Sequence, residues 1–102
     1  MKRVLITAMA ACAAAFIHTG AYAQQVDAKA AQAQAKENGC LNCHAIGEDK
    51  VGPAYKSVSA KYKGKSADDV VGAARKAAVH KAAFKKASDQ DLKLIAQWIL
   101  TL

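Results

Sequence analysis

Cys40-Leu41-Asn42-Cys43-His44 is the stretch that decides most of what this chain of 102 residues can be. Two thiols at this spacing can bond to the two vinyl groups along one edge of a porphyrin. The histidine directly after the second thiol is then held under the ring, where an imidazole nitrogen can ligate the iron. C-x-x-C-H is the attachment signature of a c-type haem. It predicts one covalently bound haem c, attached through Cys40 and Cys43, with His44 as the proximal iron ligand.

Residues 1–23 have the pattern of a secretory signal peptide that is removed after export. Two basic residues come near its start, residues 4–17 are apolar apart from one threonine, and residues 21–23 form a small-x-small cleavage pattern. The apolar run is shorter than the roughly 20 residues that a membrane span needs, so no stable span is expected. We expect a single mature domain over residues 24–102 in the periplasm, which agrees with the motif because haem c is attached outside the cytoplasm.

The three cysteines have alternative roles that the surrounding residues make less favourable. Cys12 ends a lipobox-like Ala-Ala-Cys, but Met9 stands where leucine is usual and the apolar stretch continues, which favours a discarded leader over a lipid anchor. A disulfide between Cys40 and Cys43 would give no role to His44. A thioredoxin-like site requires strands around the pair, whereas the flanks here are alanine-rich and helical in pattern. A zinc site needs a fourth ligand and usually a second cysteine pair.

The mature chain has a net positive charge, which has two possible meanings. Without the two basic residues of the leader, thirteen lysines and arginines exceed eight acidic residues by five, before the haem propionates are counted. The basic residues cluster over residues 56–65 and 75–86. They form either a solvated surface that keeps a small protein soluble or a docking face for redox proteins with an acidic surface. No nucleic-acid recognition motif is present, and the oligomeric state is left open.

Helical patterns cover the mature chain, and no strand pattern is present. Helices are predicted over residues 28–38, 54–62, 66–78 and from 88 towards the C-terminus, with a loop at 45–53 and a turn at 63–65. Asp27 is the expected N-cap of the first helix, and Gly39 ends it just before the motif. Ser66 and Ser88 each open an S-x-x-D capping pattern.

Two apolar stripes show which helix faces should be buried. The first helix has a narrow alanine stripe, and the last helix has a wider one, which Trp98 and Leu102 extend. The stripes consist of Ala28, Ala31 and Ala35, and of Leu92, Ile95, Ala96 and Ile99. The fold class is therefore all-α, with about four helices wrapped around one covalent haem. The haem would supply the large apolar body that a short domain with few aromatic residues lacks.

The mature chain resembles the class I cytochromes c, especially the small monohaem ones of the bacterial periplasm. The resemblance rests on the haem motif, on VGPAYK at residues 51–56 and on IAQWI at residues 95–99. It implies a cytochrome c fold whose first and last helices cross where a small residue faces an aromatic one, here Gly39 and Trp98. It also implies that the carbonyl of Pro53 accepts the Nδ1–H of His44 and orients this ligand. The family's function implies an electron carrier and not an enzyme, and no catalytic residue pair is visible beyond the haem.

The chain departs from this family at the second axial ligand. Members usually supply methionine from a loop rich in proline and glycine before the last helix, but methionine occurs here only at Met1 and Met9. Residues 76–87 contain neither proline nor glycine. Apart from His44, His80 is the only histidine after residue 23, and it lies in this segment among small and apolar residues. We therefore expect His80 to be the distal iron ligand.

The sequence also allows other arrangements at the second axial position of the iron. Lys81, Lys85 or Lys86 could ligate the iron only after losing a proton, which is unfavourable at neutral pH. His80 could also be a surface residue, or the iron could be five-coordinate. Two imidazoles predict a low-potential one-electron carrier, because Met/His ligation raises the potential. An open site would instead suit a haem-based sensor or ligand-binding protein, and a small haem subunit of an oxidoreductase complex is a further alternative.

Overall fold

The computed structural model describes residues 26–102, which form five α-helices and two short 3₁₀ helices and contain no strand. The elements are α1 (Ala28–Glu37), η1 (Cys40–Asn42), α2 (Tyr55–Lys61), α3 (Ala67–Arg75), η2 (Ala78–His80), α4 (Lys81–Lys86) and α5 (Asp89–Ile99). The all-α prediction is confirmed. The predicted leader, with the alternative for Cys12, lies outside the described residues. Within residues 26–102, no helix has the length and apolarity needed to cross a membrane.

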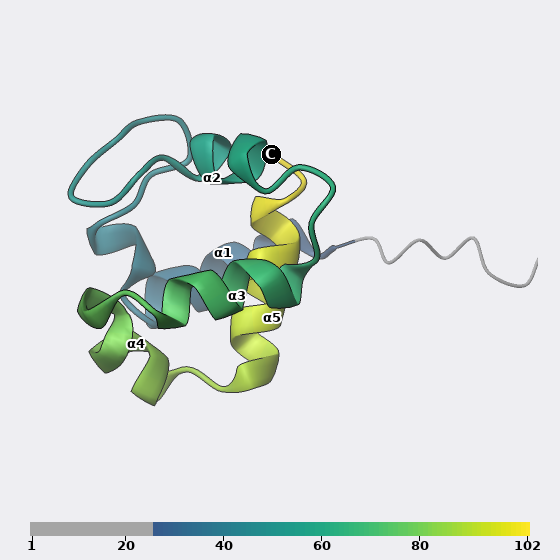
Figure 1. The fold of residues 1–102 in the computed structure, drawn as a ribbon. Coiled ribbons are helices and arrows are strands. Elements are labelled where there is room, and N and C mark those ends of the chain that lie inside the picture. The colour runs from purple at the N-terminus through teal and green to yellow at the C-terminus, as the bar shows by residue number, and fades with distance from the viewer. Residues whose placement is uncertain (1–25) are drawn as a thin grey trace, which may run out of the picture.

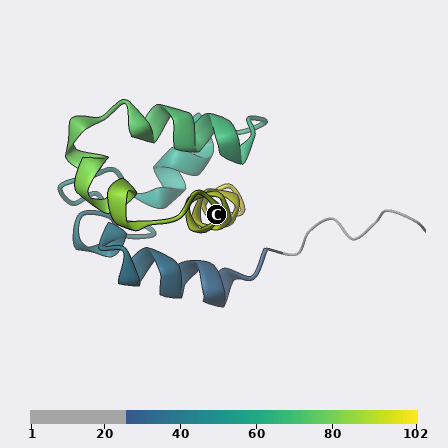
Figure 2. The same ribbon diagram turned by 90° about the horizontal axis from the view of Figure 1, so that it is seen from below.

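The C-terminal helix α5 is the centre of the arrangement. Seen end-on in Figure 2, α5 lies between α1 on one side and α3 on the other. In Figure 1, α2 and the loop before it cover one end of this layer, and α4 lies at the end of α3. The two faces of α5 therefore join the segment that carries the haem motif to the segment that carries His80.

The first helix begins and ends as its local sequence predicts. Asp27 caps α1, because its Oδ1 accepts the backbone N–H of Ala30 at 3.0 Å. Gly39 has a φ of +79°, the left-handed conformation that glycine adopts without steric cost, and the chain turns there into the motif. Of the predicted alanine stripe, Ala31 and Ala35 are fully buried, whereas Ala28 is exposed because it lies in the first turn, at the edge of the interface.

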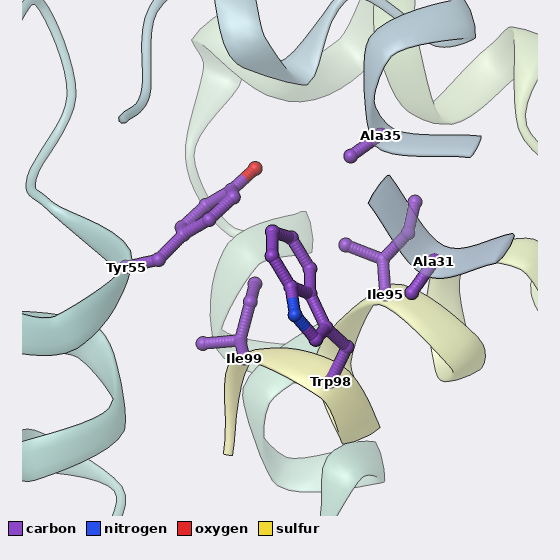
Figure 3. Close-up of a cluster of buried hydrophobic side chains, with 6 residues drawn as sticks. All are labelled: Ala31, Ala35, Tyr55, Ile95, Trp98 and Ile99. Atoms are coloured by element: carbon purple, nitrogen blue, oxygen red, sulfur yellow. The ribbon is translucent and has the colours of Figure 1, made fainter. Parts of the chain in front are cut away.

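A cluster of six buried side chains fills the space between α1, α2 and α5 (Figure 3). Trp98 is its largest member and is only 1% exposed. The small side chains of Ala31 and Ala35 leave room on α1 for the side chains of α5. The cluster consists of Ala31, Ala35, Tyr55, Ile95, Trp98 and Ile99. The predicted apolar stripe of the last helix is confirmed, since Leu92, Ile95, Ala96 and Ile99 are all buried.

The small residue at this helix crossing differs from the expectation. Gly39 was expected to face Trp98, but a Cβ placed on Gly39 would meet only the side-chain amide of Asn42, at 3.4 Å. Gly39 follows the end of α1 and serves the turn into the motif. Ala31 and Ala35, one helical turn apart, take the role of the small residues instead.

The third helix ends earlier than predicted. It was expected to reach residue 78, but α3 stops at Arg75, and a 3₁₀ turn and the short helix α4 follow. The backbone N–H groups of Lys76 and Ala77 donate to the carbonyls of Ala73 and Ala74, which tightens the last turn. Ala77 then adopts an extended conformation, with φ −81° and ψ 119°. The chain bends there and places His80 beside the end of α3.

Ser66 closes a capping box at the start of α3. Its hydroxyl accepts the backbone N–H of Asp69 at 3.2 Å, and its own N–H donates to the Asp69 carboxylate at 3.1 Å. These contacts, with the Ser66 backbone N–H first, hold the pKa of the Asp69 carboxyl below its ordinary value. The carboxylate therefore stabilises the fold above about pH 3.9, the ordinary pKa of an unfolded Asp, and this stabilisation is lost as the pH falls through the lower native value.

We predict that Ser66→Ala lowers the free energy of unfolding by about 1 kcal/mol near neutral pH, because α3 loses its cap. Urea titrations measure this difference. Ser57→Ala is the control, since Ser57 is exposed on α2 and makes no side-chain hydrogen bond within the described residues. Equal losses in the two variants would show that the capping box does not stabilise α3.

Candidate haem site

The residues predicted to bind haem line one cavity of about 570 Å³. Cys40, Cys43, His44 and Pro53 all line it, together with His80, which comes from a segment further along the chain. The remaining walls are mainly apolar and include Val58, Val70, Val71, Leu92, Ile95 and Ala96. A concave, apolar space of this size with a few polar groups is typical of a site for a large planar cofactor. The volume and the mainly apolar lining of the site therefore fit a haem.

The motif itself forms a tight turn that brings both thiols to the cavity. After Gly39, residues 40–42 form η1, and the N–H groups of Cys43 and His44 both donate to the carbonyl of Cys40. Neither Cys40 nor Cys43 is in a disulfide in the structure. Cys40 is half-buried, and this burial raises the pKa of its thiol, whereas Cys43 is exposed. The turn presents two thiols and an imidazole to the same space.

The ring of His44 is held by a carbonyl and by an aromatic ring. Its Nδ1 lies 2.7 Å from the carbonyl oxygen of Pro53, the contact expected from the family resemblance. Because a carbonyl oxygen can only accept, Nδ1 carries the proton and Nε2 keeps a free lone pair. The ring of Tyr55 stacks on His44 with centroids 5.0 Å apart, and Trp98 meets Tyr55 edge-on. Tyr55 thereby connects the buried core around Trp98 to the imidazole of His44.

The ring of His80 is held in the same manner. Its Nδ1 lies 2.7 Å from the carbonyl oxygen of Ala74 in the last turn of α3, which again leaves Nε2 with a free lone pair. The ring of Phe84, which lies in α4 four residues after His80, stacks on His80 with centroids 5.2 Å apart. His80 is half-buried and is not a free surface residue.

The imidazoles of His44 and His80 lie close together, and both line the cavity. Their ring centroids are 6.1 Å apart, with 31° between the ring planes. Two metal–nitrogen bonds of about 2 Å, each extended by an imidazole ring radius of about 1.1 Å, would separate the centroids by about 6 Å. The spacing therefore leaves room for one metal ion between the two rings. Lys81, Lys85 and Lys86 are exposed and do not line the cavity, and Lys86 donates to the carbonyl of Glu37.

Two features of this site have little or no signal in the sequence. The carbonyl of Ala74 is a backbone group that any residue would provide, so only the fold reveals it. Gly52 lies in the loop predicted over residues 45–53, and a Cβ at this position would lie 2.3 Å from Cε1 of His44. Only glycine lets the loop pass this close to the imidazole, and the adjacent Gly-Pro pair was the one available hint.

We predict that Gly52→Ala lowers the free energy of unfolding by about 1–3 kcal/mol, because the added methyl group must displace the His44 ring or the loop. The displacement should also weaken the hydrogen bond from His44 to Pro53 and reduce the yield of low-spin holoprotein. Gly47→Ala is the matched control, since nothing lies within 4 Å of a Cβ there. Denaturant titration and absorption spectra of the two variants measure both effects, and indistinguishable variants would contradict the close packing at Gly52.

Comparisons with known proteins point to one family. The family model for cytochrome c matches residues 28–102. Cytochrome c-552 of Hydrogenobacter thermophilus is 35% identical over 75 residues, which cover 67% of this chain and 76% of that protein. Cytochrome c-551 of Pseudomonas aeruginosa is 33% identical over 73 residues, 65% of this chain and 70% of that protein. The crystal structure of the class 1 cytochrome MtoD from Sideroxydans lithotrophicus ES-1 superposes with a TM-score of 0.60 and 32% identity, covering 74% of this chain and 96% of that one.

Proposed function

This chain belongs to the cytochrome c family as a small class I electron carrier with one covalent haem c, and we propose that two imidazoles, from His44 and His80, ligate its iron. We further propose that it is a periplasmic carrier of low reduction potential. One observation supports this ligand pair above all others: the ring centroids of His44 and His80 lie 6.1 Å apart, and both side chains line the same cavity as the haem motif.

The chain's own residues divide the work of holding the cofactor. Cys40 and Cys43 would fix one edge of the haem through thioether bonds, and the carbonyls of Pro53 and Ala74 hold the Nδ1–H of each histidine. Each hydrogen bond fixes the tautomer, so that Nε2 is the nitrogen directed to the iron. The haem supplies an iron centre that gains and loses one electron reversibly. Because a hydrogen bond already holds each of the two histidine ligands in position, little rearrangement accompanies the electron transfer.

The proposed low potential follows from the ligands and their partners. The family's usual thioether ligand raises the potential, but no methionine occurs after Met9 in this chain. Both histidines donate to backbone carbonyls, which makes each imidazole a more basic ligand and stabilises the oxidised iron. Both effects shift the potential downwards.

The proposed location rests on the pattern of residues 1–23, and the proposed partners rest on the charge of the protein and on the residues exposed at the cavity. The basic start and small-residue cleavage pattern of residues 1–23 support export to the periplasm. At the cavity, Val51 and Val79 are 88% and 87% exposed, and Lys61 lines the wall. An apolar opening in a strongly basic protein suits transient encounter with redox proteins that have an acidic docking surface.

Absorption spectra of the exported holoprotein, with and without CO, test this proposal together with a redox titration. We expect low-spin iron in both oxidation states, slow binding of CO and a potential below that of methionine-ligated relatives. High-spin iron or immediate binding of CO would overturn the ligand pair and favour the ligand-binding alternative. Low-spin iron with a potential as high as that of the methionine-ligated relatives would overturn the low-potential assignment.

A further inference from the structure

The hydrogen bond from His80 to Ala74 does not by itself fix the orientation of the imidazole. It fixes the position of one ring atom, Nδ1, at 2.7 Å from the carbonyl oxygen, and leaves the ring free to rotate about that contact. A flat group against the ring face is needed to fix its plane. Phe84 is such a group, because its ring lies only 9° from parallel to that of His80, with centroids 5.2 Å apart.

Phe84 is itself held by the end of α3. The guanidinium carbon of Arg75 lies 5.5 Å from the centroid of the Phe84 ring, within the range of a cation–π contact. Arg75 is also paired with Asp89 at the start of α5, with 2.5 Å between Nη2 and Oδ1. The last two residues of α3 therefore hold His80 in two ways, directly through the carbonyl of Ala74 and indirectly through Arg75 and Phe84.

The segment that carries His80, residues 78–86, depends on side-chain contacts more than the segment that carries His44. His44 follows Cys43 directly, so the covalent bond of Cys43 to the haem would anchor it. His80 has no covalently attached residue near it in the sequence. Its segment consists of a 3₁₀ turn and the six residues of α4. A helix of this length is not stable without tertiary contacts. The contacts of His80 with Ala74 and Phe84 must then keep the imidazole over the cavity.

We propose that Phe84, supported by Arg75, is a positioning residue that sets the plane of the His80 imidazole and keeps it available to the iron. This inference rests on the proposed function, in which His80 is the distal ligand. The two sides of the cavity are then built alike, because each histidine has a carbonyl for its Nδ1 and an aromatic ring, Tyr55 or Phe84, against its face.

Two substitutions at Phe84 separate positioning from simple packing. Phe84→Leu keeps an apolar side chain but removes the flat ring, whereas Phe84→Tyr keeps the ring. Because the g values of low-spin ferric iron depend on the orientation of its two imidazole planes, electron paramagnetic resonance measures the positioning effect. We expect Phe84→Leu to shift the g values and to accelerate CO binding to the ferrous protein about fivefold, the factor for one lost aromatic pair. Phe84→Tyr should match the unmodified protein in both.

The outcomes distinguish this inference from the proposed function. If the unmodified holoprotein is high-spin or binds CO at once, the ligand pair fails and this inference fails with it. If the unmodified protein is low-spin and Phe84→Leu has the same g values and CO kinetics, only the positioning role is overturned. Arg75→Met tests a second position, which is exposed. It should produce a smaller shift of the same kind, with no further shift in combination with Phe84→Leu, because Arg75 acts through Phe84.

Discussion

Replacing His80 by alanine is expected to convert the haem iron from low spin to high spin and to open it to CO. The variant removes the imidazole whose centroid lies 6.1 Å from that of His44. Among residues 26–102, the only other histidines, cysteines or methionines that line the cavity are those of the haem motif. Without a strong-field ligand on the distal face, the iron becomes five-coordinate or weakly six-coordinate. Absorption and resonance Raman spectra of the ferric and ferrous protein measure the change.

His80→Met and Lys81→Ala sharpen this prediction. His80→Met restores the type of ligand usual in the family, so the potential should rise by on the order of 0.1 V, a fraction of the roughly 0.8 V that axial ligands span. Lys81→Ala is the neighbouring control, because Lys81 is exposed and does not line the cavity. Its spectrum and potential should stay unchanged. A low-spin spectrum in His80→Ala that does not differ from the unmodified protein would remove His80 from the iron.

Trp98→Ala is expected to cause the largest loss of stability, about 3–5 kcal/mol, because it empties a fully buried aromatic site. Trp98 is 1% exposed and packs among Ala31, Ala35, Ile95 and Ile99 (Figure 3). A loss of this size approaches the whole free energy of unfolding of a small domain. The variant should therefore unfold at far lower urea concentrations and accumulate poorly as holoprotein.

The same substitution should also loosen the proximal side of the site. The ring of Trp98 meets Tyr55 edge-on at 5.5 Å, and Tyr55 stacks on His44. Urea titration followed by circular dichroism and by the haem absorbance measures both effects. Trp98→Phe is the control, since it keeps an aromatic ring and should lose less than half as much stability. Loss of less than about 1 kcal/mol in Trp98→Ala would contradict the central place of this side chain in the core.

The local signals predicted most of the fold because they act over a few residues. Asp27, Ser66 and Ser88 each cap a helix whose start they mark, since a side-chain oxygen reaches only the first turn that follows it. The apolar stripe of α5 was predicted for the same reason. The spacing of a helix face is a property of the segment alone, whatever packs against it.

The parts that the sequence did not predict depend on contacts between segments. The end of α3 at Arg75 and the formation of α4 depend on the backbone turn that places His80 against Ala74. The role of the alanines at the helix crossing depends on how closely α1 and α5 approach. Gly39 was assigned there by family resemblance, but it serves the turn into the motif.

At the candidate site, side-chain chemistry was predictable and backbone chemistry was not. Cys40, Cys43 and His44 are adjacent in the motif, and His80 was selected by elimination because no methionine was available. The structure places all four around one cavity, although their roles toward the iron stay predictions. The carbonyl of Ala74 and the stacked ring of Phe84 could not be inferred, because they become neighbours of His80 only through the bend after α3.

NMR of the exported ferric holoprotein, labelled selectively with ¹⁵N-histidine, decides whether both imidazoles lie on the iron. After residue 23 the chain contains only His44 and His80, so each signal can be assigned by a single substitution. The unpaired electron of low-spin ferric iron shifts the nuclei of a coordinated ring far from their ordinary positions. We predict two strongly shifted imidazoles, one of which disappears in His80→Ala. A single shifted imidazole, with the signals of His80 at ordinary positions, would contradict the proposed ligand pair.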